Sequence, residues 1–138
     1  MAQIRRFLQL SPARQALIRW LQKVNFGDIR TISIQDGDPI FDQHSVAVFD
    51  LRLDRDENAR PELRLADFDL PAEVRRLISL LDELKDGTIQ RLEVRAGIPH
   101  RLFFESHSFV AQAIVQGSLE AEVDELASGV GSNKIEMI

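Results

Sequence analysis

The chain of 138 residues contains no cysteine, and only one tryptophan and two methionines. Without cysteine there is no disulfide framework, no thiolate nucleophile and no thiolate metal ligand. The absence also fits a reducing compartment, so we expect the protein in the cytoplasm. No apolar run approaches the ~20 residues that a membrane-spanning helix needs. No apolar stretch follows Arg5 and Arg6 to form a signal peptide, so we expect no membrane association.

Basic residues are too few to balance the acids. The 17 lysines and arginines face 22 aspartates and glutamates, which gives a net charge of −5. An acidic chain is a poor candidate for a dedicated nucleic-acid-binding protein. The charge is also uneven, because residues 1–30 are mainly basic and residues 102–138 mainly acidic. Two interpretations stay open: a solvated surface, or attraction between the two ends, within one chain or between two.

No group of residues typical of a catalytic or cofactor site is present. None of the three histidines, His44, His100 and His107, is spaced at i, i+3 or i+4 from another ligand on a predicted helix. We therefore expect surface or hydrogen-bonded histidines. The glycines in 129–131 neither follow a predicted strand nor precede a helix, as a phosphate-binding loop would. We expect a non-enzymatic protein without metal or cofactor, and the sequence leaves any ligand-binding residues unknown.

An internal repeat is the most informative feature that the chain does contain. When the sequence is shifted by 60 residues without a gap, seven positions between 17 and 40 meet identical residues. They are Leu17, Ile18, Leu21, Gly27, Ile29, Gly37 and Pro39, which match Leu77, Ile78, Leu81, Gly87, Ile89, Gly97 and Pro99. Unrelated sequences share about one or two identities over such a window. The pattern predicts a duplicated unit of helix, strand, turn and strand.

The first copy begins with a predicted amphipathic helix. Ser11 is suited to cap it, and Pro12 to occupy its first position, where no backbone N–H is required. Apolar residues then recur at helical spacing over 17–24. We expect Gly27 to end the helix as a left-handed cap.

The second copy repeats this plan. Asp69 and Pro71 are placed to open the helix, and apolar residues recur at helical spacing over 74–84. We expect Gly87 to end this helix as Gly27 ends the first.

A β-hairpin is predicted after each helix. The apolar positions are 29, 32 and 34, and again 89, 92 and 94, which breaks the strict alternation of a strand. We expect Ile29 and Ile89 either to pack under the helix-to-strand turn or to mark a β-bulge. Gly37 and Gly97 supply the positive φ of a tight turn, and the return strands are expected near 40–41 and 101–104.

The remaining segments do not repeat. Residues 46–53 alternate like an extra strand, and residues 54–67 form a charged connection that has room for a short strand at 63–65. Helical spacing over about 108–127 predicts a C-terminal extension, followed by a Gly- and Ser-rich tail that we expect to be mobile. We therefore expect a single domain over 1–138, built from two repeats of about 12–53 and 71–105.

The segment LQKVNFGDIRTISIQDGDPI (21–40) resembles the short YezD-like family of bacterial proteins, and LDELKDGTIQRLEVRAGIPH (81–100) resembles it less closely. Members of that family look like one helix followed by a glycine, a strand, a hairpin glycine and a return strand. The similarity covers about a third of the chain and consists mostly of turn glycines. The resemblance implies this fold and a bacterial source, and it implies no activity.

These patterns together predict an α+β fold, a mainly antiparallel sheet with the helices on one face. Trp20 lies off the helical stripe and Phe26 follows at the helix end, so the two either widen the core or contact another subunit. We expect a self-associating interaction module, a homodimer, in part because the uncovered sheet face would have Phe and Val side chains to hide. Two alternatives remain: a small-ligand or regulatory domain that uses the cleft between the repeats, and a weak nucleic-acid-binding protein acting through the basic N-terminus.

Overall fold

The computed structural model describes residues 3–56 and 58–106. The elements, in chain order, are the 3₁₀ helix η1 (Phe7–Gln9), α1 (Pro12–Val24), β1 (Phe26–Gln35), β2 (Asp38–Ile40), β3 (Val46–Phe49), the 3₁₀ helix η2 (Pro61–Arg64), α2 (Ala72–Leu84), β4 (Gly87–Arg95) and β5 (Ile98–Ser106). The helices expected at 108–127 and the tail after them lie outside the described residues. The described chain has the predicted α+β architecture.

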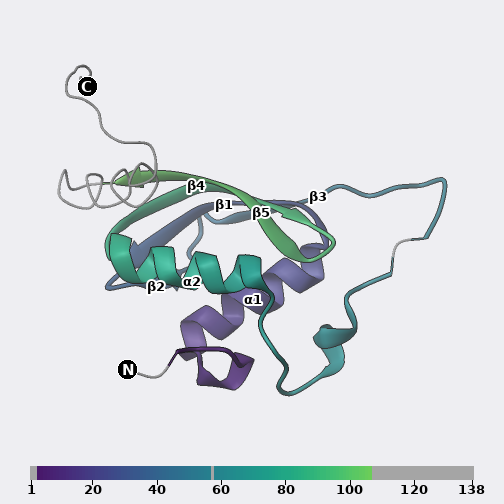
Figure 1. Ribbon diagram of the computed structural model, residues 1–138. Helices are drawn as coiled ribbons and strands as arrows, with labels where there is room; N and C mark the ends of the chain where they lie inside the picture. The colour runs from purple at the N-terminus through teal and green to yellow at the C-terminus, as the bar shows by residue number, and fades with distance from the viewer. Residues whose placement is uncertain (1–2, 57, 107–138) are drawn as a thin grey trace, which may run out of the picture.

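The five strands form one antiparallel sheet with β1 and β4 at its centre. β5 pairs with the outer edge of β4, while β2 and β3 pair with successive parts of the outer edge of β1. Both α1 and α2 lie on the same side of this sheet (Figure 1). Among the described residues, no helix covers the opposite side.

The core lies between the two helices and the sheet. Each helix presents the apolar stripe that its sequence predicts, and β1 and β4 meet these stripes with branched side chains. The buried apolar residues of these elements are Leu17, Ile18, Leu21 and Val24 from α1, Val74, Leu77, Ile78, Leu81 and Leu84 from α2, and Ile29, Ile32, Ile34, Ile89, Leu92 and Val94 from the sheet. Each such side chain stabilises the fold by about 1.5–3 kcal/mol when it is fully buried.

The starts of the two helices differ. Ser11 caps α1, because its hydroxyl accepts a hydrogen bond of 3.2 Å from the backbone N–H of Arg14, and Pro12 follows in the first helical position. At α2 the cap position belongs to Pro71, which offers no side-chain acceptor. The prediction that Asp69 opens α2 is wrong, because its carboxylate instead accepts a hydrogen bond of 3.0 Å from Arg6.

The helix ends also differ from the prediction. α1 and α2 are closed by Asn25 and Lys85, each at φ 65° and ψ −61°, so the assignment of Gly27 and Gly87 as caps is wrong. Both glycines lie within strands, at φ 147° and 157°. A Cβ atom on Gly27 would collide with the carbonyl oxygen of Val48. Gly27 is therefore required for the close approach of β3.

The odd spacing of apolar residues reflects a real irregularity in both central strands. The register of β4 against β5 shifts between Ile89 and Arg91, which confirms the bulge alternative for Ile89. In β1, Thr31 has φ 63°, and Ile29 and Ile32 on either side of it are both buried. One residue in each strand is thus accommodated without disturbing the apolar face.

The hairpin turns follow the prediction. Asp36 and Gly37 have φ 51° and 81°, and Ala96 and Gly97 have φ 54° and 76°. The strands after them are unequal, because β2 has 3 residues and β5 has 9. The extra strand is also shorter than predicted, since β3 covers Val46–Phe49, and residues 63–65 contribute to η2 and the residue after it rather than to a strand.

Candidate interaction surface

Charged side chains occupy the centre of the open face, which we define as the sheet face that α1 and α2 leave uncovered. The Asp28 carboxylate on β1 is only 8% exposed and accepts a hydrogen bond of 2.7 Å from Nε of Arg30. Nε of Arg91, on β4, lies 3.5 Å from the same carboxylate, and Arg91 also pairs with Glu93 at 3.4 Å. The hydrogen bond to Asp28 raises the pKa of Arg30 above its usual value.

Strand register explains why these charges cluster. β1 and β4 pair so that Asp28 stands opposite Glu93, and Arg30 opposite Arg91. Like charges in opposite positions destabilise a sheet, but here the ion pairs run along each strand and diagonally between strands. The cluster is therefore internally compensated. The expectation of exposed Phe and Val side chains is wrong for the centre of this face.

The outer strand β5 continues the open face with a different pattern. Arg101, Phe103 and Glu105 alternate with Leu102 and Phe104, which pack against the core on the helix side. Phe103 is 36% exposed, and the guanidinium of Arg101 lies 4.9 Å from the centre of its ring. Within the described residues β4 is the only strand that pairs with β5, so β5 is an edge strand of the described sheet.

The opposite edge of the sheet is short and interrupted. β2 and β3 have 3 and 4 residues, and the hydroxyl of Ser45 accepts a hydrogen bond from the backbone N–H of Asp42 in the turn between them. Ile40, Val46 and Phe49 are all exposed along this edge. Both edges thus present apolar side chains, and of the described edge strands β5 is the longest.

Trp20 lies beside the β3 edge, on the helix side of the sheet. It is 38% exposed, with Nζ of Lys23 at 5.1 Å from its ring centre. It lines a shallow hollow of about 220 Å³ together with Phe41 and Val46. Phe26, the first residue of β1, pairs with Arg95 of β4 and falls on the open face by strand alternation. The two candidate interface residues therefore lie on opposite faces of the sheet, and their role in an interface stays a prediction.

Two further hollows lie along α2. One of about 230 Å³ is formed by α2 and β5 and includes Leu80 and Arg101, and another of about 240 Å³ includes Gln3, Arg75 and Asp82. All three hollows are smaller than the ~300–1,000 Å³ typical of small-molecule sites. The Trp20 hollow is built entirely from the first half of the chain, and the Leu80 hollow entirely from the second. These hollows therefore do not form the predicted cleft between the repeats.

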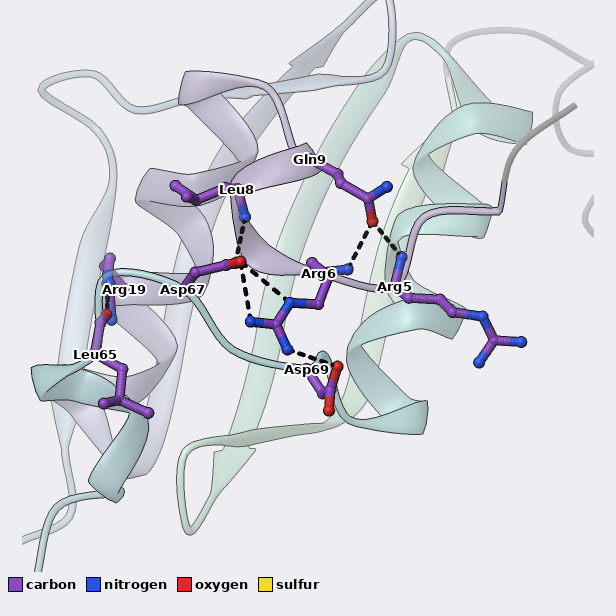
Figure 2. Close-up of polar contacts among 8 residues, drawn as sticks. All are labelled: Arg5, Arg6, Leu8, Gln9, Arg19, Leu65, Asp67 and Asp69. Carbon is purple, nitrogen blue, oxygen red and sulfur yellow. Dashed lines mark hydrogen bonds and ion pairs between the residues drawn. The ribbon is translucent and has the colours of Figure 1, made fainter.

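The N-terminal segment is fastened to the connection before α2 (Figure 2). The Asp67 carboxylate accepts hydrogen bonds from the backbone N–H of Leu8 at 3.0 Å and from Nε of Arg6 at 3.1 Å, while Asp69 accepts one from Arg6 at 3.0 Å. The Leu8 N–H, with a further contribution from Arg6, holds the pKa of Asp67 below its usual value. The two aspartates in turn raise the pKa of Arg6. We call this group of four residues the N-terminal clasp.

An aromatic pair beneath the clasp completes the attachment. The rings of Phe7 and Phe68 stack with their centres 4.8 Å apart, and the guanidinium of Arg19 lies 4.3 Å from the Phe7 ring centre. Arg19 also donates hydrogen bonds to the backbone carbonyl groups of Glu62 and Leu65. This arginine therefore ties α1 to the connection.

Several basic side chains of the N-terminal half are engaged within the chain. Arg14 contacts Asp82 at 2.6 Å, and Arg6, Arg19 and Arg30 make the contacts described above. Farther along, Arg60 pairs with Glu62 at 2.7 Å, and this hydrogen bond lowers the pKa of Glu62. The acidic partners of Arg6, Arg14 and Arg30 lie between residues 28 and 82, so these contacts are not the attraction between the two ends of the chain, which stays a prediction. The acidic residues beyond 106 lie outside the described part.

The described residues contain no group of three His, Asp or Glu side chains placed to hold a metal ion. In the same part of the chain, neither helix is long and apolar enough to cross a lipid bilayer.

Compared with protein-family models, curated proteins and solved structures, the chain has no significant match. The resemblance to the YezD-like family accordingly stays a prediction.

Sequence reasoning did not single out the open-face cluster or the outer strand. The available signal was alternation: Arg101 and Phe103 lie two positions apart in the return strand predicted near 101–104, and Glu105 continues the alternation. Asp28 gave a weaker signal, because its partner Arg91 is recognised only when the register of β1 against β4 is known.

Proposed function

We propose that the chain is a non-enzymatic interaction module that self-associates as a homodimer. The observation that carries this proposal is the distribution of exposed apolar side chains at the sheet edges, with Ile40, Val46 and Phe49 on one and Phe103 on the other. An unpaired strand edge is a template for another strand, and natural proteins usually protect such edges. An edge strand as long as β5 is therefore suited to a specific partner.

The alternatives have less support. Ligand binding between the repeats is disfavoured by the small hollows, two of which are built from one half of the chain each. Nucleic-acid binding through the N-terminus is disfavoured because Arg6, Arg14 and Arg19 contact groups of their own chain. Both alternatives predict a partner other than the chain itself.

We also propose that the two halves are copies of one unit. α1 and α2 span 12–24 and 72–84, and Asn25 and Lys85 share the same backbone angles. The pairing of Gly27 with Val94 is matched by the pairing of Ile34 with Gly87, as a twofold relation between the halves requires. Superposition of residues 12–42 on 71–104 tests this proposal. Helices and hairpins that do not coincide would contradict it.

A bacterial source and a cytoplasmic location belong to the same proposal. They are supported by the YezD-like resemblance and by the absence of cysteine. Fractionation of the native cell, with detection of the full chain, tests the location. Recovery outside the cytoplasm would overturn it.

Light scattering of the full chain at micromolar concentration tests self-association. We expect a mass above that of the 15.7 kDa monomer. A salt series identifies the forces involved, because salt screens exposed charges and leaves apolar contacts largely intact. A dimer held by Trp20 and other apolar groups would persist in high salt, whereas one guided by charged pairs would weaken.

A further inference from the structure

We propose that the partner of β5 is the β5 strand of a second copy of this chain, paired antiparallel about a twofold axis at Phe103. This inference rests on the proposed self-association and specifies its surface and register. It joins the two sheets into one continuous antiparallel sheet. The Trp20 hollow and the β2–β3 edge remain outside the contact.

The side chains of β5 are complementary to themselves in this register. With Phe103 on the axis, Arg101 stands opposite Glu105 of the second copy, and the same pair forms again by symmetry. Opposite charges in directly facing positions stabilise antiparallel strands. On the helix side, Leu102 stands opposite Phe104 of the second copy, so apolar groups also meet apolar groups.

Other registers lose this complementarity. An axis at Arg101 or at Glu105 would place two like charges directly opposite each other, which is destabilising. With an axis at Leu102 or Phe104, Arg101 would no longer stand opposite Glu105 of the second copy. A slip by one residue would set the open face of one copy against the helix side of the other. The charge pattern therefore favours Phe103 as the centre.

The monomer already holds both charged side chains near the required position. The guanidinium of Arg101 rests 4.9 Å from the Phe103 ring centre, and Gln90 donates a hydrogen bond of 2.9 Å to Glu105. Arg101 also stands opposite Glu93 on β4, so a row of charges extends across the edge. Side chains ordered before association lose less entropy on binding.

The other sheet edge does not offer the same surface. β2 and β3 are short and are separated by a turn, and neither carries a basic residue to pair with an acidic one. β5 has 9 residues, and each residue from Arg101 to Ser106 has a partner on β4. Because β5 is the one long sheet edge in the part of the chain that the structure describes, strand pairing through it closes as a dimer and does not continue as a fibre.

Charge exchange tests the proposed pairs in the full chain. We expect Arg101→Glu and Glu105→Arg each to raise the dimer dissociation constant roughly tenfold, because each change faces like charges across the axis twice. The double variant, Arg101→Glu with Glu105→Arg, restores the opposite charges and should recover most of the affinity. Arg64→Glu, at an exposed position in η2, makes the same charge change away from β5 and should leave dimerisation unchanged.

Cysteine substitution tests the register, since the chain has no cysteine of its own. Facing residues of antiparallel strands have Cα atoms about 4.5–5.5 Å apart, within the ~4.4–6.8 Å that a disulfide spans. Phe103→Cys should therefore cross-link two chains under mild oxidation. His100 is exposed on the same strand. His100→Cys should not cross-link two chains, because position 100 of one chain would lie roughly 20 Å from position 100 of the other.

The outcomes separate this inference from the proposed function. A dimer that cross-links through Phe103→Cys, and that is weakened by each single charge change and restored by the double one, supports the inference. A dimer that cross-links through His100→Cys, or through neither variant, overturns the inference and leaves self-association standing. A monomer at every concentration overturns both. Circular dichroism of each variant identifies any loss of folding.

Discussion

Gly27 shows how a single backbone position can decide the fit of a whole strand. Its φ of 147° lies in the region that favours glycine, and a Cβ atom there would strike the backbone oxygen of Val48. Backbone atoms held in a sheet have little freedom to move away. The glycine therefore acts through strand packing, whereas Gly37 acts through its turn.

We predict that Gly27→Ala lowers the free energy of unfolding by about 2 kcal/mol or more, since backbone strain adds to the steric conflict. Gly37→Ala is the matched control. A Cβ atom on Gly37 would meet the guanidinium of Arg14 and, less closely, the carbonyl oxygen of Leu81, a milder conflict than that of Gly27 with Val48, so we expect a smaller loss of about 1 kcal/mol. Urea denaturation measures both values. Equal losses would contradict the role assigned to Val48.

Lys85 occupies the tight turn that closes α2. Its φ is 65°, and the backbone N–H of Asp86 donates a hydrogen bond of 2.7 Å to the carbonyl of Leu84 across it. This is a three-residue turn that is strained for a residue with a side chain. Asn25 has the same angles, but its side chain donates a hydrogen bond to the carbonyl of Asn58.

Lys85→Gly should therefore raise the free energy of unfolding by about 0.5–1 kcal/mol, because glycine adopts positive φ without strain. Asn25→Gly should gain less, since it also loses the bond to Asn58. Thermal or urea denaturation of both variants provides the measurement. A loss of stability in Lys85→Gly would show that the turn is not strained in solution.

The helices were predictable as elements because their information is local. Apolar residues such as Leu17 and Leu81 recur with the helical period, and Ser11 with Pro12 marks one helix start. The other boundaries depend on distant residues. Asp69 does not cap α2 because Arg6, far away in the sequence, binds its carboxylate, and Gly27 is needed by β3 rather than by α1.

The N-terminal clasp should make the attachment of η1 sensitive to acid. The pKa of Asp67 is lowered from an ordinary value of 3.8, chiefly by the Leu8 N–H. A lowered pKa means that the ionised group stabilises the folded state fully above 3.8, and that this contribution is lost as the pH falls through the lower folded pKa.

We predict that Asp67→Asn destabilises the protein at neutral pH, and that its difference from the unmodified chain shrinks as the pH falls well below 3.8. Asp54→Asn is the control, because Asp54 is exposed and contacts only the neighbouring Arg52 among the described pairs. Urea denaturation across a pH series measures both differences. A difference for Asp67→Asn that does not change with pH would contradict an electrostatic role for the clasp.

The whole molecule was predictable in its layers but not in its surfaces. The repeat and the apolar periods predict two helices on one face of an antiparallel sheet, and Figure 1 shows this arrangement. The charged centre of the open face could not be predicted, because the contact of Asp28 with Arg91 follows from the strand register. Trp20 was marked by its position off the helical stripe. The importance of β5 emerged only from the strand order, which places β5 at the edge of the described sheet.

Self-association is the central claim, and sedimentation equilibrium of the full chain tests it most directly. A concentration series from low to high micromolar at moderate salt gives the mass without assumptions about shape. We predict an average mass that rises with concentration from near 15.7 kDa towards twice that value and then levels off. A mass that stays at 15.7 kDa over the whole series would contradict the account.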